Sequence, residues 1–301
     1  MNKDPEQKLT KFYKYMPAES AINSLKNETL RWSSPLCFND PFDVPRELAE
    51  GMKFADIAAA KWDVLKDYLS NYDAPIDDLH PHFQKMIIRY RNLNDTGQNL
   101  PPQENNKDDP SIKVVENAMK AVRKHWCEYL LPRFRILCLS ARKDIVPMWH
   151  HYADEYQGVV LEFDSCSGAS GLWSKIRRVE YPHNPPELFT EKGWSHLIIL
   201  SPEKQREKIQ NFHLYTKKPD WEYEQEYRLV IINDRDSENI PNYSDWKLPK
   251  ENITNIYFGP KISVQNKQLL MSLISEKLPH AQTYGMSFKF GWKIQFEKAC
   301  G

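Results

Sequence analysis

The segment Asp220–Ile232, DWEYEQEYRLVII, joins the strongest strand signal of the chain to a cluster of charged residues. Its aromatic and β-branched residues predict a strand that runs from Glu222 to the end of the segment. Side chains in a strand alternate between two faces, so Glu222, Glu224, Glu226 and Arg228 are expected on one face. Aligned carboxylates repel one another. The face therefore predicts either a solvated edge strand or the wall of a binding site.

Glu224 and Glu226 are the candidate catalytic residues of this segment. If they line a pocket, one carboxylate can stabilise an oxocarbenium ion on a sugar while its neighbour orients a nucleophile. We expect Glu226 to take the first role and Glu224 the second. Arg228 either pairs with these acids or holds a phosphate through its planar guanidinium.

A second cluster lies in CLSARKDIVPMWHHYADEYQGVVLEF, which spans 138–163. Ser140 ends a predicted strand, and a short helix that follows carries Trp149, His151 and Tyr152. Neighbouring histidines lie about 100° apart on a helix, so His150 and His151 cannot bind one metal in the usual i, i+4 manner. A histidine here is either a structural residue or a proton carrier or phosphate donor. The sequence predicts no metal site.

The third cluster is FNDPFD, residues 38–43, which follows Ser33 and Ser34. Its Asn, Asp and Pro predict a rigid turn, because Asn and Asp side chains bond nearby backbone and Pro fixes φ. This turn is either purely structural or the floor of a nucleotide site, to which Ser33 and Asn39 would belong. Neither G-x-x-x-x-G-K-[ST] nor G-x-G-x-x-G occurs, which argues against a P-loop or Rossmann enzyme.

The remaining pattern mixes strands and helices without a regular βαβ repeat. We predict strands at 9–16, 29–34, 134–140, 158–164, 176–181, 253–258, 283–288 and 292–296, and helices at 17–26, 51–72, 83–91, 111–131, 146–155, 201–217 and 264–278. Ser111 is expected to cap its helix and Pro132 to end it, after a polar loop at 92–110. The fold class is therefore α+β, with a mainly antiparallel sheet and a helical insertion at about 44–132.

Composition limits the kinds of partner. Acidic and basic residues number 41 each, so no global field attracts nucleic acid or an anionic membrane. Only local basic stretches such as Lys175–Arg178 and Lys217–Lys218 remain to guide a nucleic acid, and such short runs are usually solvated. No leader and no membrane-spanning run is visible, which predicts a cytoplasmic protein without a membrane partner. Five scattered cysteines without C-x-x-C spacing indicate neither a disulfide framework nor a zinc site.

Four blocks taken together resemble a bacterial family of domains of unknown function. They are FYKY at 12–15, SSPLCFNDPFD at 33–43, CLS with MWHHYADEYQGVVLEF at 138–163, and K-x-x-W-x-x-E-x-E-Y-R at 218–228. Members of that family are similar to divergent ADP-ribosyltransferases, including the DarT-type toxins, and several occur in toxin–antitoxin or phage-defence settings. The resemblance implies one domain over 1–301, with a split sheet of ADP-ribosyltransferase type around an NAD-binding cleft.

The resemblance also implies NAD as a substrate and gives roles to individual residues. In transferases with an E-x-E motif the second Glu bonds the nicotinamide ribose and the first assists the acceptor, which matches Glu226 and Glu224. The chain departs from the transferases at the first strand, where Lys14 and Tyr15 replace an Arg or His. The residues expected at the NAD site are Tyr15, Ser33, Asn39, Ser140, Trp149, His151, Tyr152 and Arg228.

The resulting hypothesis is a cytoplasmic ADP-ribosyltransferase that acts as a toxin or phage-defence effector. Its acceptor would be RNA, DNA or a protein, and an antitoxin or chaperone is an expected partner. The alternative is a non-catalytic sensor that binds a nucleotide or a partner protein through the same clusters. A metal-dependent nuclease is a weaker alternative, because an E-x-E pair alone is meagre support for a Mg²⁺ site.

Overall fold

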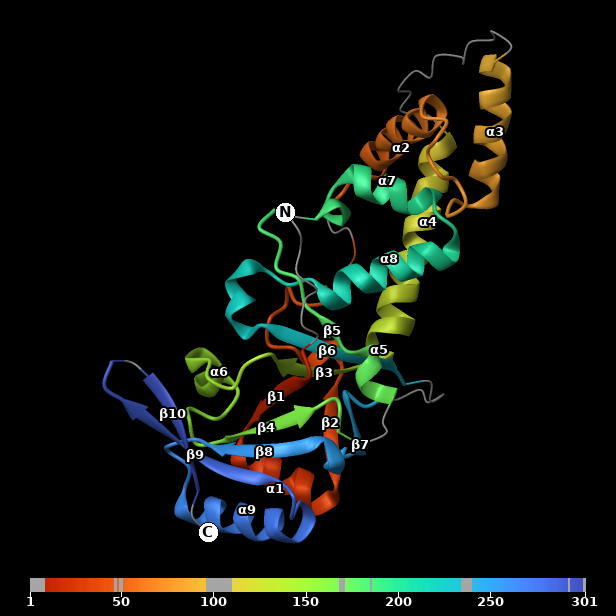
Figure 1. Cartoon of the computed structure of the whole chain (residues 1–301). Coiled ribbons are helices and arrows are strands. Elements are labelled where there is room, and N and C mark those ends of the chain that lie inside the picture. Colours follow the sequence, from red (N-terminus) through yellow and green to blue (C-terminus); the bar gives the residue numbers. More distant parts are fainter. Residues whose placement is uncertain are drawn as a thin grey trace. The chain divides into compact units, whose positions relative to one another are not determined.

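The computed structural model describes residues 9–45, 48, 51–95, 110–167, 171–184, 186–233, 240–291 and 293–299. The chain divides into two compact units. Residues 1–39, 133–181 and 217–301 form the first, and residues 40–132 and 182–216 form the second. The first unit holds the β-sheet and the second is helical (Figure 1), which confirms the predicted α+β class.

The first unit is built on one large sheet whose main path runs β10-β9-β8-β4-β1-β3-β2-β7, with β6 beside β3 and β5 beside β6. Among the described strands only β8 and β9 pair in parallel, so the sheet is mainly antiparallel, as predicted. The strands are β1 (Lys11–Met16), β2 (Thr29–Ser33), β3 (Phe134–Ser140), β4 (Val159–Asp164), β5 (Arg177–Arg178), β6 (Glu226–Ile232), β7 (Tyr243–Lys247), β8 (Ile253–Phe258), β9 (Gln282–Lys289) and β10 (Lys293–Lys298).

The sheet divides at β3. One edge of β3 pairs with β6 along its whole length, from Phe134 opposite Ile232 to Ser140 opposite Glu226. The other edge meets two strands at single points, β1 through Tyr13 and Ser140 and β2 through Ser33 and Ile136. The sheet therefore has two branches that share β3.

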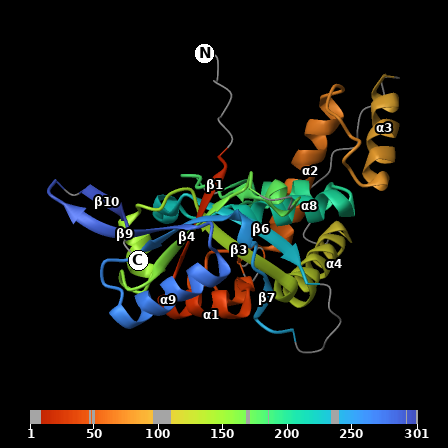
Figure 2. The ribbon, with the colours of Figure 1, turned by 60° about the horizontal axis from the view of Figure 1, so that its bottom comes forward.

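One face of the sheet is closed by α1 (Ala18–Asn27) and α9 (Val264–Lys277), which lie side by side in Figures 1 and 2. The core between these helices and the strands is apolar and includes Phe12, Leu161 and Leu229. Burying such side chains contributes about 1.5–3 kcal/mol each, before the entropy cost of ordering them. This face therefore holds the first unit together.

The opposite face carries the alternate side chains of the same strands. Tyr13 and Tyr15 of β1 and Tyr257 of β8 form an aromatic cluster with Trp149 of α6 (Val146–His151). The two faces follow from the alternation of side chains along β1, where Phe12 and Met16 face the apolar core and the tyrosines face α6. This aromatic cluster covers the sheet beside β3, the strand at which the sheet divides.

The second unit consists of α2 (Phe54–Ser70), α3 (Pro81–Asp95), α4 (Pro110–Lys124), a π-helical turn (His125–Leu130), α7 (Glu191–Ile199) and α8 (Pro202–Tyr215). The helical insertion predicted at 44–132 falls in this unit, together with residues 182–216. The predicted loop at 92–110 begins later than expected, because α3 continues to Asp95. Residues 96–109 lie outside the described part of the chain.

Two details of the predicted helix at 111–131 are wrong. The helix already begins at Pro110, so Ser111 is a helical residue and not the cap. Pro132 does not end it, since α5 (Leu131–Arg133) contains Pro132 and leads directly into β3. Pro is tolerated in a short turn of this kind because φ near −65° is helical. Within the described residues, no helix has the length and apolar character needed to cross a membrane.

Gly158, just before β4, offers a test of this packing. A Cβ atom at this position would meet the backbone oxygen of Met16 and the backbone of Ala153, neither of which can swing away. Gly158→Ala is expected to lower the free energy of unfolding by about 2–3 kcal/mol, measured by urea denaturation. Gly285→Ala in β9 is the control, because its Cβ would meet no atom within 4 Å. Equal effects of the two substitutions would contradict the close approach at Gly158.

Candidate functional site

The segment before β6 is not a strand, contrary to the prediction for 222–225. Residues Pro219–Glu224 form a 3-10 helix, Gln225 follows with φ 46° and ψ 51°, and β6 begins only at Glu226. Gln225 is held in this left-handed conformation by its carbonyl, which accepts a hydrogen bond of 3.0 Å from the Ala141 amide at the end of β3. As a result Glu222 is exposed and lies apart from the face expected for it.

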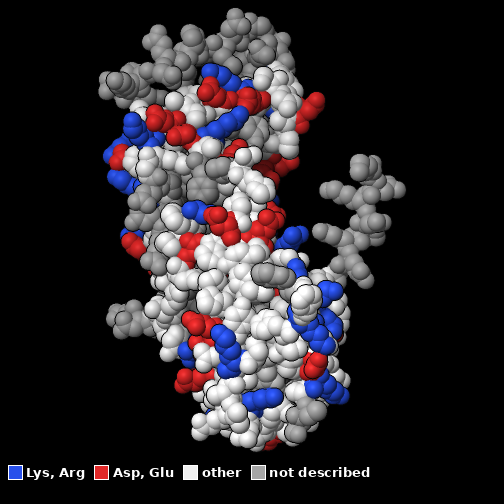
Figure 3. All heavy atoms as spheres, turned by 90° about the vertical axis from the view of Figure 1, so that its left-hand side faces the viewer, with Lys and Arg blue, Asp and Glu red and all other residues white. Residues whose placement is uncertain are grey.

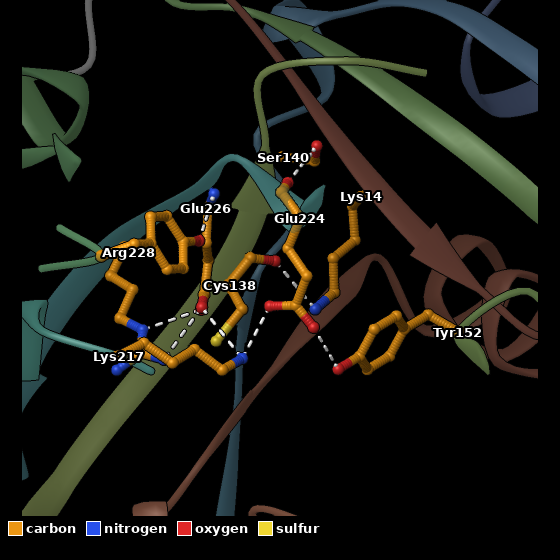
Figure 4. Close-up of polar contacts among 9 residues, drawn as sticks. Lys14, Cys138, Ser140, Tyr152, Lys217, Glu224, Glu226 and Arg228 are labelled. Atoms are coloured by element: carbon orange, nitrogen blue, oxygen red, sulfur yellow. Dashed lines mark hydrogen bonds and ion pairs between the residues drawn. The ribbon is translucent and has the colours of Figure 1, made fainter. Parts of the chain in front are cut away.

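The turn at Gln225 still brings Glu224 and Glu226 to one cation. Lys217 Nζ lies 2.6 Å from Glu224 Oε2 and 3.4 Å from Glu226 Oε2 (Figure 4). The ammonium also lies 4.7 Å from the centre of the Trp221 ring. All three charged side chains are at least nine-tenths buried, with Lys217 at 7% exposure and Glu224 at 3%. The two acids predicted to share a face thus meet at one cation, in a geometry that an extended strand would not give.

Glu226 is clamped by Arg228. The guanidinium donates from Nε to Glu226 Oε1 at 2.7 Å and from Nη2 to Oε2 at 2.9 Å, which is the bidentate arrangement that suits a carboxylate. Arg228 is fully buried, and its guanidinium lies 5.4 Å from the ring centre of Phe38. The sequence allows Arg228 either to pair with the acids or to hold a phosphate. In the structure it pairs with Glu226.

Residues from α6 and the β3 end surround Glu224. The Tyr152 hydroxyl donates to Glu224 Oε1 at 2.7 Å, and the Ser140 hydroxyl donates to the Glu224 carbonyl at 2.7 Å (Figure 4). Tyr181 accepts the Glu226 amide at 2.9 Å. Side-chain and backbone atoms of Glu224 and Glu226 are therefore both held, which gives the pair a defined geometry.

Tyr15 and Trp149 support the loop between β3 and α6. The Tyr15 hydroxyl donates to the Arg142 carbonyl at 2.8 Å and accepts the Ile145 amide at 3.3 Å. The Trp149 indole donates to the Lys143 carbonyl at 2.7 Å, and its ring is completely buried. Both side chains thus lie in the aromatic cluster. Their hydrogen bonds go to the loop backbone and not to the carboxylates.

The surroundings shift the pKa values of Glu224 and Glu226 in opposite directions. Burial disfavours a charged Glu226, but Arg228 and Lys217 outweigh it and lower the pKa of this carboxyl to about 2. Burial and repulsion from Glu226 raise the pKa of Glu224, although Lys217 and Tyr152 oppose this rise. Glu226 therefore stays ionised, while Glu224 is the member of the pair that can exchange a proton.

A second buried acid on the same sheet face differs from this pair. Glu162 of β4 is 1% exposed and accepts hydrogen bonds from Tyr257 at 2.6 Å, Asn255 at 2.7 Å and Lys11 at 2.9 Å. Burial opposes its ionisation, but these donors lower its pKa. Because these hydrogen bonds and Lys11 hold its carboxylate, Glu162 has the features of a structural anchor.

Two predicted site residues, Ser33 and His151, make no described contact with Glu224 or Glu226, and Asn39 lies at the surface. Ser33 lies at the end of β2 and pairs with Ile136 and Tyr243. Asn39 is exposed beyond the short 3-10 helix at Pro35–Cys37. His151 is exposed at the end of α6, with ring contacts to His150 and Tyr152. The residues that do gather are Glu224, Glu226, Arg228, Tyr152 and Ser140.

Sequence reasoning missed Lys217, Tyr181 and Cys138. The sequence predicts Lys217 in a short basic run that guides a nucleic acid or is solvated, but its amide donates to the Glu180 carbonyl at 2.9 Å and the residue is buried. Cys138 faces Arg228 across β3 and β6, and burial raises the pKa of its thiol. The only local signal was the position of Lys217 directly before the K-x-x-W-x-x-E-x-E block.

The described residues contain no group of three His, Cys, Asp or Glu side chains that would hold a metal ion. The charge of Glu224 and Glu226 is instead balanced by Lys217 and Arg228. Both acidic and basic side chains are visible on the face shown in Figure 3, with uncharged areas between them. Arg177 and Arg178 of the predicted KIRR stretch are exposed on β5.

The opposite pKa shifts predict a pH signature. Glu226→Gln is expected to lower the free energy of unfolding at pH 7 by roughly 3 kcal/mol, because the pKa falls from 4.5 to about 2 on folding. Because the pKa of Glu226 is lower in the folded than in the unfolded chain, ionised Glu226 stabilises the fold above pH 4.5. This stabilisation is lost as the pH falls toward 2. The difference between the wild type and this variant should therefore shrink over that range in urea titrations.

Glu224→Gln is the matched control for this measurement. Its pKa is raised, so an ionised Glu224 costs stability as the pH rises above its unfolded value, and a neutral amide is expected to cost less at pH 7 than Glu226→Gln does. Equal losses for the two variants across the pH range would contradict the assignment of opposite shifts.

Comparison with known proteins adds one family. Residues 148–229 match the model of a family described as "Protein of unknown function (DUF2971)", which covers less than half of the chain. No curated protein and no solved structure matches. The matched region contains Tyr152, Lys217, Glu224, Glu226 and Arg228. The candidate site is thus composed largely of the segment that resembles this family of unknown function.

Proposed function

We propose that the chain cleaves NAD between nicotinamide and ribose and transfers ADP-ribose to an acceptor. The observation that carries the proposal is the pair of neighbouring carboxylates with opposite pKa shifts, both bound to Lys217. Environments that separate the pKa values of two acids assign them different roles in acid–base chemistry. Glycosidic bond cleavage needs such a pair.

Glu226 would stabilise the positive charge that develops on the ribose as the bond to nicotinamide lengthens. This carboxyl is ionised at any physiological pH, and its low-dielectric surroundings strengthen its attraction for a cation. Arg228 and Lys217 hold it by three contacts, so its orientation is set before substrate binds. Preorganised charge of this kind favours the transition state over the ground state.

Glu224 would act on the acceptor. In the reaction the C–N bond breaks and its electron pair leaves with nicotinamide, while the acceptor forms a new bond to the same ribose carbon. The acceptor's proton passes to Glu224, whose raised pKa makes it a better base than an ordinary carboxylate. In the free protein the Tyr152 hydroxyl occupies Oε1 of Glu224, so it would have to move before the acceptor can reach this oxygen.

The sheet supports the same proposal at the level of architecture. A mainly antiparallel sheet that divides at one strand is the kind expected from the resemblance to ADP-ribosyltransferases, and Ser140 and Glu226 lie paired at the division. Substrate would reach the acids by displacing Tyr152, the partly exposed member of the cluster. Tyr152 and Ser140 are therefore the NAD-site candidates that we retain beside Arg228.

We place the activity in a toxin or phage-defence setting, as the resemblance implies, with an antitoxin or chaperone as a partner and RNA, DNA or protein as the acceptor. Such a protein would work in the cytoplasm. The exposed basic residues of the KIRR stretch, Lys175, Arg177 and Arg178, would contact a nucleic acid.

A second candidate is favoured by one observation. Both carboxylates are almost fully buried, and two cations already neutralise them. A self-contained network of this kind also suits a protein that binds a nucleotide or partner without turnover, in which the cluster only stabilises the fold.

The two candidates differ in NAD turnover. With NAD labelled in its adenylate part, together with total RNA, DNA and cell lysate, the wild type is expected to release nicotinamide and transfer label. Glu226→Gln should reduce turnover at least about 100-fold, because it removes the charge that faces the oxocarbenium ion. Nicotinamide release and label transfer are measured in parallel, and circular dichroism checks folding.

Glu222→Gln is the control, since Glu222 lies two residues from the pair but is exposed. Its turnover should equal that of the wild type. If Glu226→Gln is folded and still turns over NAD at the wild-type rate, the assignment fails. If the wild type neither turns over NAD nor binds it in calorimetry, the non-catalytic candidate replaces the enzyme.

A further inference from the structure

The β9–β10 hairpin forms one end of the main path of the sheet (Figures 1 and 2). Among the described strands β10 pairs with β9 alone, so its outer edge carries backbone N–H and C=O groups that no described strand uses. An open edge of this kind can pair with a strand of another chain. β10 is six residues long and keeps a continuous register with β9, so its edge is regular enough to accept a further strand.

The two faces of β10 differ in character. Ile294 and Phe296 are partly buried and pack against the aromatic cluster. Side chains alternate along a strand, so Lys293, Gln295 and Glu297 lie on the other face. Lys293 and Glu297 are exposed. The strand therefore presents apolar side chains on one face and two opposite charges, four residues apart, on the other.

The order of these residues is complementary to itself. If two copies of β10 pair antiparallel about Gln295, Lys293 of each copy lies opposite Glu297 of the other. On the second face, Ile294 of each copy lies opposite Phe296 of the other. Opposite charges and apolar pairs in directly opposed positions both stabilise a sheet. Both faces of the strand are thus satisfied in one register.

The neighbouring strand β9 favours the same register. Lys289 lies directly opposite Lys293 in the hairpin, and like charges in this position repel. Glu297 of a second copy would supply a counter-charge to Lys293. On the apolar face, Phe288 lies opposite Ile294 and is 59% exposed, so pairing would continue its surface into a row of apolar side chains across both copies.

We propose that the chain forms a symmetric dimer in which two β10 strands pair antiparallel about Gln295. The occupant of the edge is a second copy of this chain, because the complementary charges belong to the strand itself. A two-fold contact of this kind is closed and stops at two subunits. β7, at the other end of the main path, lacks this property, since pairing about its middle residue would set Asp245 opposite Asp245. The dimer is independent of the proposed NAD turnover.

Sedimentation velocity on the full chain tests the dimer. The wild type is expected to pass from monomer to dimer between about 1 and 100 µM, because two short paired strands bury less area than a permanent interface does. Lys247→Glu is the control, since Lys247 is exposed on β7 at the other end of the sheet, and it should dimerise like the wild type. A wild type that stays monomeric over this range overturns the proposal and leaves the edge to a strand of a different protein.

Two charge reversals test the register. Lys293→Glu would set two acids opposite each other, and Glu297→Lys would set two lysines opposite each other. Each variant alone should raise the dissociation constant of the dimer at least about tenfold. In an equimolar mixture every charge pair across the interface is complementary again, so the two variants should form a mixed dimer with near wild-type affinity.

The mixture also controls for folding, because only correctly folded variants can restore the dimer, and circular dichroism checks each variant separately. Dimerisation of either variant alone with wild-type affinity would show that Lys293 and Glu297 do not meet across the interface. A mixture that stays monomeric while both variants are folded would equally reject this pairing of β10.

Discussion

The buried contact of Glu224 and Glu226 with Lys217 and Arg228 is the constraint that the rest of the first unit has to satisfy. Removing a carboxylate from water costs several kcal/mol unless a cation and hydrogen bonds replace the solvent. Here the four charges balance and each acid has at least two donors. The contributing side chains come from α6, β6 and the segments before it, so the network forms only when these segments have assembled.

The same two strands serve packing on one face and chemistry on the other. Leu137 and Leu229 belong to the apolar core, while Cys138 and Arg228 belong to the charged cluster. Because side chains alternate strictly, a shift of register by one residue would bury the charges among leucines and expose the core. The hydrophobic face therefore holds the charged face in register.

In the proposed enzyme, the stability of this network would oppose its activity. The charges of the network are balanced, and the Tyr152 hydroxyl is bound to Glu224. A substrate that engages the pair has to replace that hydroxyl and gain at least as much free energy as the displaced contact supplied. The longest of the contacts described in this network is the one between Lys217 Nζ and Glu226 Oε2, at 3.4 Å.

The sequence by itself determined the elements whose pattern is local, and only the tertiary structure decided the rest. Strands β3 and β8 have the predicted bounds, because a short, mainly apolar run between two turns predicts a buried strand. The E-x-E spacing identified the two acids. Strand β7 was missed because most of its residues are exposed, and its pairing with β2 alone makes it a strand. The left-handed turn at Gln225 and the burial of Lys217 depend on hydrogen bonds to Ala141 and Glu180, residues remote in sequence, so no local pattern contains them.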